Sequence, residues 1–222
     1  MTSILPYAPQ RDMAGKYAHR GSYLLTASTG AVTGVAARTA TAGFLFTMRN
    51  PTASAASLYV KRIAARFIAT TAYGTAQETG ADLILARSYT ASASGGTAVD
   101  VGSTVANTGN LAATFATSVI TANCTRVATT DAFTAGTQTL DANPIGVVSG
   151  WTSAIGIMVP EATAGAASGF ASLFDYKASA HEMPIKLVAD EGFVIRNLIL
   201  MGATGVGRWD FLVEWDEGRA ES

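Results

Sequence analysis

Cysteine, histidine and charge are scarce in this chain. Its 222 residues include one cysteine and two histidines, and charged residues make up 14% of the total, against roughly 25% in ordinary soluble domains. So few cysteine and histidine side chains exclude a disulfide framework and a zinc finger. The 15 basic and 16 acidic residues nearly cancel, which argues against a nucleic-acid-binding surface and against an acidic disordered chain. We therefore expect no metal, no other cofactor and no nucleic-acid partner.

Long apolar runs are also absent. The longest candidate, residues 193–203, is interrupted by Arg196 and Asn197, and a membrane-spanning helix needs roughly 18 consecutive apolar residues. Residues 1–21 contain prolines and charges, where a secretory signal needs a continuous apolar stretch. The sequence therefore predicts a protein that folds in the cytoplasm and has no membrane partner.

Small residues are abundant instead. Hydrophobic residues form 49% of the chain, which allows a sizeable core, and alanine and threonine together account for about a third of it. A surface of alanine, threonine, serine and glycine loses little side-chain entropy when it packs flat against another protein. A compositional bias of the coding sequence would explain the same counts, so both interpretations stay open.

Large side chains recur with the period of two residues that indicates β-strands. The clearest segment is residues 209–216, which have one bulky apolar face and one mostly acidic face that we expect to be solvated. In residues 57–71 the alternation of apolar and polar side chains shifts by one residue near Ala64 and Ala65, which predicts a bulge or bend. Further strands are predicted at residues 23–26, 43–49, 82–89, 145–159, 173–176, 184–188 and 193–196.

These segments predict an all-β fold of eight to ten short strands. We expect a single jelly-roll-like β-sandwich over residues 21–222. The nearly uncharged residues 91–143 should form short strands and long loops within it, although a linker of that composition is the alternative. Residues 184–188 and 193–196 should be two strands around a turn at Glu191 and Gly192.

We expect residues 1–20 to form an extended N-terminal arm. They contain two prolines and several rings and charges, with neither a helical nor a strand period. Such a segment is either disordered or docked on a partner. We select four of its side chains as candidate partner contacts: Tyr7, Arg11, Tyr17 and Arg20.

Motifs that could support catalysis are weak. The glycines of residues 202–207 resemble a dinucleotide-binding loop, but residues 208–215 alternate as a strand and leave no room for a βαβ unit. We expect a glycine-rich hairpin loop between the last two strands. His19 and His181 are far apart in the sequence, which disfavours a metal site or a Ser-His-Asp triad. Cys124 is expected to be a buried, inert thiol. No catalytic residue is predicted.

Charged residues form two clusters, each of which allows a functional and a structural interpretation. Asp210, Glu214, Asp216 and Glu217 lie on or beside the last strand, where two carboxylates could act as in a glycosidase. A solvated strand face that resists edge aggregation is the favoured interpretation. Lys61, Arg62, Arg66 and Arg87 could form a basic stripe for nucleic acid across two neighbouring strands, but pairing with carboxylates of adjacent strands is the simpler interpretation.

Tryptophan side chains offer a further possibility. Trp209 or Trp151 could form a platform for a sugar ring. Trp209, however, lies on the apolar face of the last strand with Phe211 and Trp215, which favours a position in the core.

Several segments of the sequence resemble those of a known class of proteins. They are residues 50–51 leading into 57–63, then residues 127–144, 184–197 and 207–217. Together they resemble jelly-roll capsid decoration or cement proteins of tailed bacteriophages. These segments contain no catalytic motif. The resemblance therefore assigns a function to no individual residue.

The resemblance implies a non-enzymatic virion protein on the capsid exterior, assembled in the host cytoplasm. Its expected partners are the major capsid protein and further copies of itself, as a dimer or trimer. A tail, baseplate or head-fibre structural protein is an alternative from the same class. A carbohydrate-binding β-sandwich module is an alternative from a different class.

The arm hypothesis gives a direct prediction. Deleting residues 1–20 should abolish binding to capsids, because the arm is expected to supply the partner contacts, and should leave the sandwich folded. Co-sedimentation with undecorated capsids measures the binding, and circular dichroism measures the fold. Full capsid binding by the truncated protein would show that the arm hypothesis is wrong.

Overall fold

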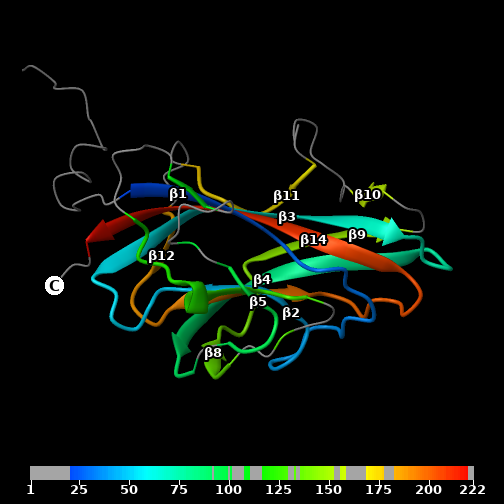
Figure 1. Ribbon diagram of the computed structural model, residues 1–222, viewed down its shortest axis with the longest axis horizontal. Coiled ribbons are helices and arrows are strands. Elements are labelled where there is room, and N and C mark those ends of the chain that lie inside the picture. Colours follow the sequence, from blue (N-terminus) through cyan, green and yellow to red (C-terminus); the bar gives the residue numbers. More distant parts are fainter. Residues whose placement is uncertain are drawn as a thin grey trace, which may run out of the picture.

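Two antiparallel sheets packed face to face form the protein, as the computed structural model shows (Figure 1). This arrangement confirms the predicted all-β sandwich. The structure describes residues 21–91, 93–99, 101, 108–110, 117–129, 133, 136–152, 156–158, 169–177 and 183–219. The predicted arm lies outside these residues, so its boundary with the sandwich stays a prediction.

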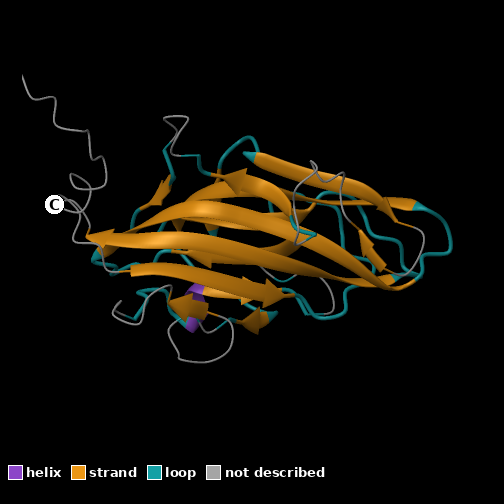
Figure 2. Cartoon of the chain, turned by 90° about the horizontal axis from the view of Figure 1, so that it is seen from above, coloured by secondary structure: helices purple, strands orange, loops and turns teal. Residues whose placement is uncertain are grey.

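Three long strands form the centre of the first sheet. β14 (Val206–Arg219) pairs with β3 (Ala56–Thr71) on one side and with β1 (Gly21–Ser28) on the other, and Figure 2 shows these long strands running side by side. Short strands extend the sheet beyond β1 and along the outer edge of β3. They are β6 (Thr108–Asn110), β10 (Gly156–Met158), β11 (Ala171–Asp175) and β12 (Ile185–Leu187).

The second sheet is centred on β13 (Gly192–Asn197), which lies between β2 (Phe44–Arg49) and β4 (Gln77–Tyr89). Its other strands are β5 (Thr97–Ala98), β7 (Thr125–Val127), β8 (Gln138–Leu140) and β9 (Gly146–Thr152). A single turn of 3₁₀ helix, η1 (Ala122–Cys124), precedes β7. Residues 91–143 therefore contain β5 to β8, as the sequence predicted, where they are described.

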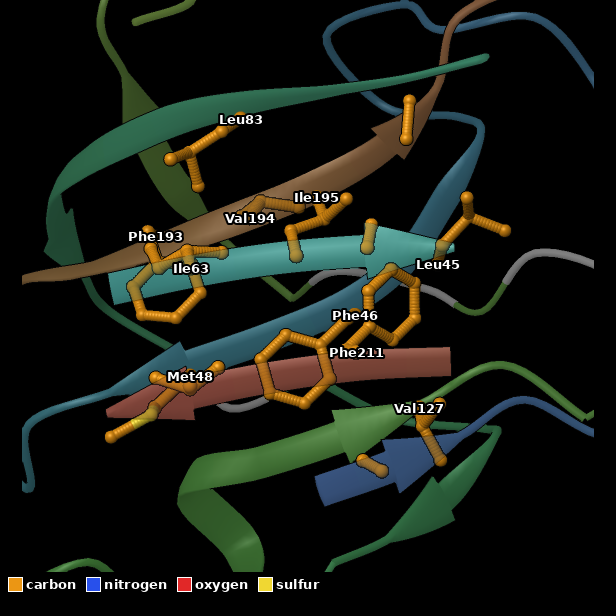
Figure 3. Packing of buried hydrophobic residues seen from close by; sticks show 14 of the residues in the cluster. Leu45, Phe46, Met48, Ile63, Leu83, Val127, Phe193, Val194, Ile195 and Phe211 are labelled. Atoms are coloured by element: carbon orange, nitrogen blue, oxygen red, sulfur yellow. The ribbon is translucent and has the colours of Figure 1, made fainter. Parts of the chain in front are cut away.

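The core lies between the sheets and contains the apolar face of β14. Trp209, Phe211, Val213 and Trp215 are at most 1% exposed, so the predicted alternation of this strand is confirmed. The Phe211 ring meets Phe46 of the opposite sheet at 5.3 Å between centroids (Figure 3). Aromatic rings that interlock across two sheets bury large apolar areas and fix the sheet spacing.

The long strand β3 contains a bulge, but earlier than predicted. Arg62 pairs with Glu214 and Val60 pairs with Trp215, so Lys61 is the extra residue. A bulge inserts one residue and reverses the phase of the side chains after it. Because Lys61 and Arg62 are both only partly buried, the phase changes there and not at Ala64 and Ala65.

The second sheet is buried on both faces along β2. Phe46 points into the space between the sheets, yet Leu45 is fully buried and Thr47 is 3% exposed on the other face. The Thr47 hydroxyl lies 2.9 Å from the Tyr89 hydroxyl, and burial raises the pKa of Tyr89. A strand buried on both faces shows little alternation of polarity, which explains the continuous apolar composition of this segment.

One expected turn and one expected hairpin loop both connect the two sheets. β12 pairs with β3 in the first sheet, whereas β13 pairs with β2 and β4 in the second. The turn at Asp190 (φ 65°) therefore crosses from one sheet to the other. Residues 198–205 likewise connect β13 to β14 across the sandwich. The predicted strands are confirmed, but the hairpin predicted at residues 202–207 is wrong, because β13 and β14 lie in different sheets.

Removing a core ring should destabilise the sandwich. We expect Phe211→Ala to lower the free energy of unfolding by about 3–5 kcal/mol, because the substitution leaves a cavity between the sheets. Urea denaturation measures the change. Leu200→Ala is the control, because Leu200 is 63% exposed and its loss should change stability by no more than about 0.5 kcal/mol. Equal effects of the two substitutions would contradict this description of the core.

Candidate functional site

The candidate contacts in the N-terminal segment lie outside the described residues. This applies to Tyr7, Arg11, Tyr17 and Arg20, and to His19. His181 also falls outside them. In the part of the chain that the structure describes, no group of three or more histidine, cysteine or acidic side chains could hold a metal ion. No described helix is long and apolar enough to cross a membrane.

The acidic face of β14 is paired with its neighbours and is not simply solvated. Asp210 is 5% exposed. Its carboxylate accepts hydrogen bonds from Arg66 Nε on β3 at 2.8 Å and from Ser28 Oγ on β1 at 2.6 Å. The register places these three residues in one row across the sheet. The predicted solvated face is therefore wrong at Asp210, because a cation and a hydroxyl on flanking strands cover it.

The same pattern repeats along the strand. Asp216 pairs with Lys61 at 2.8 Å and accepts a hydrogen bond from Ser22, and Glu214 stands opposite Arg62. Pairing between strands, the simpler interpretation of the basic residues, is confirmed for Lys61 with Asp216 and for Arg66 with Asp210. The acidic residues of this face thus link three strands.

The basic stripe does not form as one surface. Lys61, Arg62 and Arg66 lie on β3 in the first sheet, whereas Arg87 lies on β4 in the second. Arg87 instead donates to both carboxylate oxygens of Asp141, at 2.8 and 2.6 Å. Its hydrogen bond lowers the pKa of Asp141. The prediction of neighbouring strands is therefore wrong for Arg87.

Glu217 belongs to the buried face of the strand and not to the acidic cluster. It is fully buried, and it accepts hydrogen bonds from Ser118 Oγ at 2.5 Å, from Val119 N at 3.0 Å and from Trp215 Nε1 at 3.3 Å. These contacts tie residues 118–119 to β14. Residues two apart on a regular strand point to the same face, and Glu217 is two residues after the buried Trp215. This spacing could have predicted that Glu217 points into the sandwich.

A buried ion cluster on the second sheet was not anticipated. Asp82 on β4 has no exposed surface and accepts hydrogen bonds from Arg196 Nη2 at 2.7 Å and Nε at 3.1 Å. Arg38 also donates to the same carboxylate. A buried carboxylate needs such partners to offset its lost hydration. The cluster holds residues 38–39 against the sheet, since Arg196 also donates to the Thr39 carbonyl.

The glycines of residues 202–207 serve close packing. A Cβ at Gly205 would lie 2.1 Å from the Tyr73 ring, and a Cβ at Gly207 would lie 2.1 Å from the Phe67 ring. Burial raises the pKa of Tyr73 to about 12. The loop is thus occupied by aromatic side chains of the protein itself. Cys124 is buried, as predicted.

An exposed apolar row lies along β9 and the residue before it, within the predicted strand segment 145–159. Ile145, Val147 and Trp151, here called the β9 row, are 43%, 50% and 70% exposed. They share one face at the period of two, whereas Val148 on the opposite face is 7% exposed. The row lies at the side of β4 away from β13. Because exposed tryptophan is uncommon and tryptophan is enriched at interaction hot spots, we select this row as the candidate functional surface.

Charge is unevenly distributed beside the β9 row. Trp151 stands opposite Glu78 on β4, and no described residue forms an ion pair or hydrogen bond with the Glu78 side chain. Val147 stands opposite Asp82, where Arg38 and Arg196 leave one net positive charge. The row therefore has an acidic end at Trp151 and a basic end at Val147.

The platform suggested at Trp209 does not exist, because Trp209 is 1% exposed and its ring meets Phe67 at 5.2 Å. Trp215 is also fully buried. Trp151 is therefore the exposed member of the three tryptophans.

Comparisons with known proteins give no relative. No protein-family model, no curated protein and no solved structure matches this chain.

The exposure of a single tryptophan can be measured in solution. Iodide should quench only the Trp151 component of the fluorescence, because the other two indoles are buried between the sheets. We expect Trp151→Phe to abolish the quenchable component and Trp209→Phe to retain it. A quenchable component that survives in Trp151→Phe would contradict the described burial.

Proposed function

We propose that this protein is a non-enzymatic structural subunit of a tailed-phage virion that binds the outer capsid shell as a cement or decoration protein. The observation that supports the proposal is the exposed β9 row on a rigid sandwich whose acidic residues on β14 pair across the sheet. Such a surface suits contact with another protein. The resemblance of residues 50–51, 57–63, 127–144, 184–197 and 207–217 to capsid decoration proteins supplies the class of partner.

The proposed binding works through repetition. One exposed tryptophan flanked by Ile145 and Val147 gives a compact apolar anchor of the kind that dominates protein interfaces. A shell presents the same contact many times, so that weak contacts add up when neighbouring copies are linked. The subunit would stabilise the shell by bridging its neighbours, with no covalent chemistry.

A carbohydrate-binding module is the second candidate, supported by one specific observation. Trp151 is 70% exposed on the face of a strand and stands opposite the carboxylate of Glu78. An exposed indole beside a polar group can hold a sugar ring by its apolar face. Aliphatic Val147 and Ile145 beside it favour a protein partner. A tail or baseplate location is the alternative within the structural class.

Shell binding tests the proposal. We expect the protein to co-sediment saturably with undecorated capsids of the same phage, and Trp151→Ala to weaken this binding at least tenfold because it removes the central anchor. Met183→Ala is the matched control. Met183 is 77% exposed but lies next to β12, on the first sheet, so its loss should leave binding unchanged.

Two outcomes would contradict the proposal. One is a folded protein that fails to bind capsids. The other is protection of Trp151 from iodide by a panel of glycans without capsid binding, which would favour the carbohydrate-binding module. Capsid binding that Trp151→Ala leaves unchanged would keep the shell partner but exclude the β9 row as its contact.

A further inference from the structure

We propose that Trp151 and Glu78 together bind an arginine side chain of the shell protein, whose guanidinium group stacks on the indole and donates hydrogen bonds to the carboxylate. The inference rests on the proposed function, because it names the group that the shell presents to the β9 row. Three observations support it: the register of β4 and β9, the distribution of charge among the described residues, and the aliphatic side chains in the row.

The two side chains lie beside each other on one face of the second sheet. Glu78 on β4 and Trp151 on β9 stand directly opposite each other in an antiparallel pair, and such residues have Cβ atoms about 5 Å apart. Trp151 is 70% exposed and Glu78 is partly exposed. An indole ring and a carboxylate at this spacing can contact one ligand group at the same time.

Glu78 differs from the other carboxylates on the described strands in having no cation beside it. It stands opposite Trp151, and no described residue forms an ion pair or hydrogen bond with its side chain. Elsewhere in the described residues, two acids stand opposite Arg62 and five form ion pairs with arginine or lysine. An accessible carboxylate of this kind is complementary to a cation from a partner. The two acids opposite Arg62 are Glu214 and Asp175, and the five in ion pairs are Asp82, Asp141, Asp190, Asp210 and Asp216.

Among cations, arginine suits this pair of groups best. Its guanidinium group is planar and weakly hydrated, so it stacks on an aromatic ring while its N–H groups donate two parallel hydrogen bonds to one carboxylate. Tryptophan is the aromatic side chain that attracts a cation most strongly. A lysine ammonium is a compact, strongly hydrated charge that makes no such flat contact. The pair of Trp151 and Glu78 therefore favours arginine over lysine.

The other end of the β9 row determines the orientation of the partner. Val147 lies on the same face of β9 as Trp151, roughly 13 Å away along the strand. It stands opposite Asp82, whose two arginine partners leave one net positive charge. A partner arginine is repelled from this end and attracted to the end with Glu78. The partner should thus place its arginine at Trp151 and apolar side chains over Val147.

A neutral sugar uses the same surface less completely. A sugar ring stacked on Trp151 needs several polar groups around it to bind its hydroxyls. On this face of β9, however, Ser149 supplies one hydroxyl, and Val147 has no hydrogen-bonding side chain. The charge of Glu78 would also stay uncompensated. These features favour a cationic side chain, and the sugar becomes an outcome of the test.

An NMR titration of the tryptophan indole N–H resonances tests the inference on the full chain. The probes are two capped tripeptides, leucine-arginine-leucine and leucine-citrulline-leucine, because citrulline has the shape of arginine without its charge. We expect the arginine peptide to shift the Trp151 resonance and the citrulline peptide to bind roughly tenfold more weakly. Trp151→Leu identifies the resonance by its loss and should abolish the response.

Two glutamate variants separate the site from a general effect of charge. Glu78→Gln should weaken binding of the arginine peptide roughly tenfold, because it removes the charge and nearly keeps the shape. Glu214→Gln is the matched control. Glu214 is also partly exposed on a strand, but it stands opposite Arg62 and Leu24 with no exposed ring beside it, so its substitution should leave the affinity unchanged.

The inference is overturned if the arginine peptide leaves the Trp151 resonance unshifted, or if it binds Glu78→Gln as tightly as the wild type. A series of neutral methyl glycosides that shifts this resonance when the arginine peptide does not would assign the surface to a sugar.

Capsid co-sedimentation is scored separately and should be weakened roughly tenfold by Glu78→Gln. Capsid binding that this variant leaves unchanged rejects the inference and keeps the proposed function. An arginine peptide that binds at Trp151 in a protein that does not bind capsids confirms the arginine site and rejects the proposed function alone.

Discussion

The pairing of β3 with β14 is the constraint on which the rest of the structure depends. It runs antiparallel from the pair Val206 and Thr71 to the pair Arg219 and Ala56. Two shifts interrupt the register, and the one at Lys61 turns two consecutive basic side chains outward. This register points the large rings of β14 into the sandwich and aligns its carboxylates with cations and hydroxyls on both flanking strands. β1, β10, β11 and β12 all add to this pair.

The consequence for function lies in what remains accessible. Asp210 and Asp216 are paired across the first sheet, Asp82 is paired within the second, and Glu217 fastens residues 118–119. These four carboxylates of the described residues therefore hold the sandwich together. The β9 row differs, since its apolar side chains contribute little to the core and remain exposed. A rigid body with such a surface is suited to assembly by contact.

Sequence patterns predicted the local structure well and the long-range structure poorly. The alternation in residues 209–216 gave the inward rings, because a regular strand fixes the faces of its own residues. It could not give the partners of β12 and β13, since each pairs with strands more than a hundred residues away. For the same reason the sequence offered Trp151 and Trp209 as alternative platforms and could not choose between them: β9 is as apolar as a buried strand, and only its position beside β4 leaves one face open. Glu217 was grouped with the exposed acidic residues, although its spacing of two residues from Trp215 puts both side chains on the same face of the strand.

In the function that we propose, this sandwich acts by repeated protein contact on a symmetric shell. The most direct measurement is the mass of undecorated capsids before and after saturation with the purified protein. The account predicts a fixed number of bound copies that is a multiple allowed by the capsid symmetry, reached at a defined concentration. Absence of any mass increase, or an increase that grows without saturation, would contradict it.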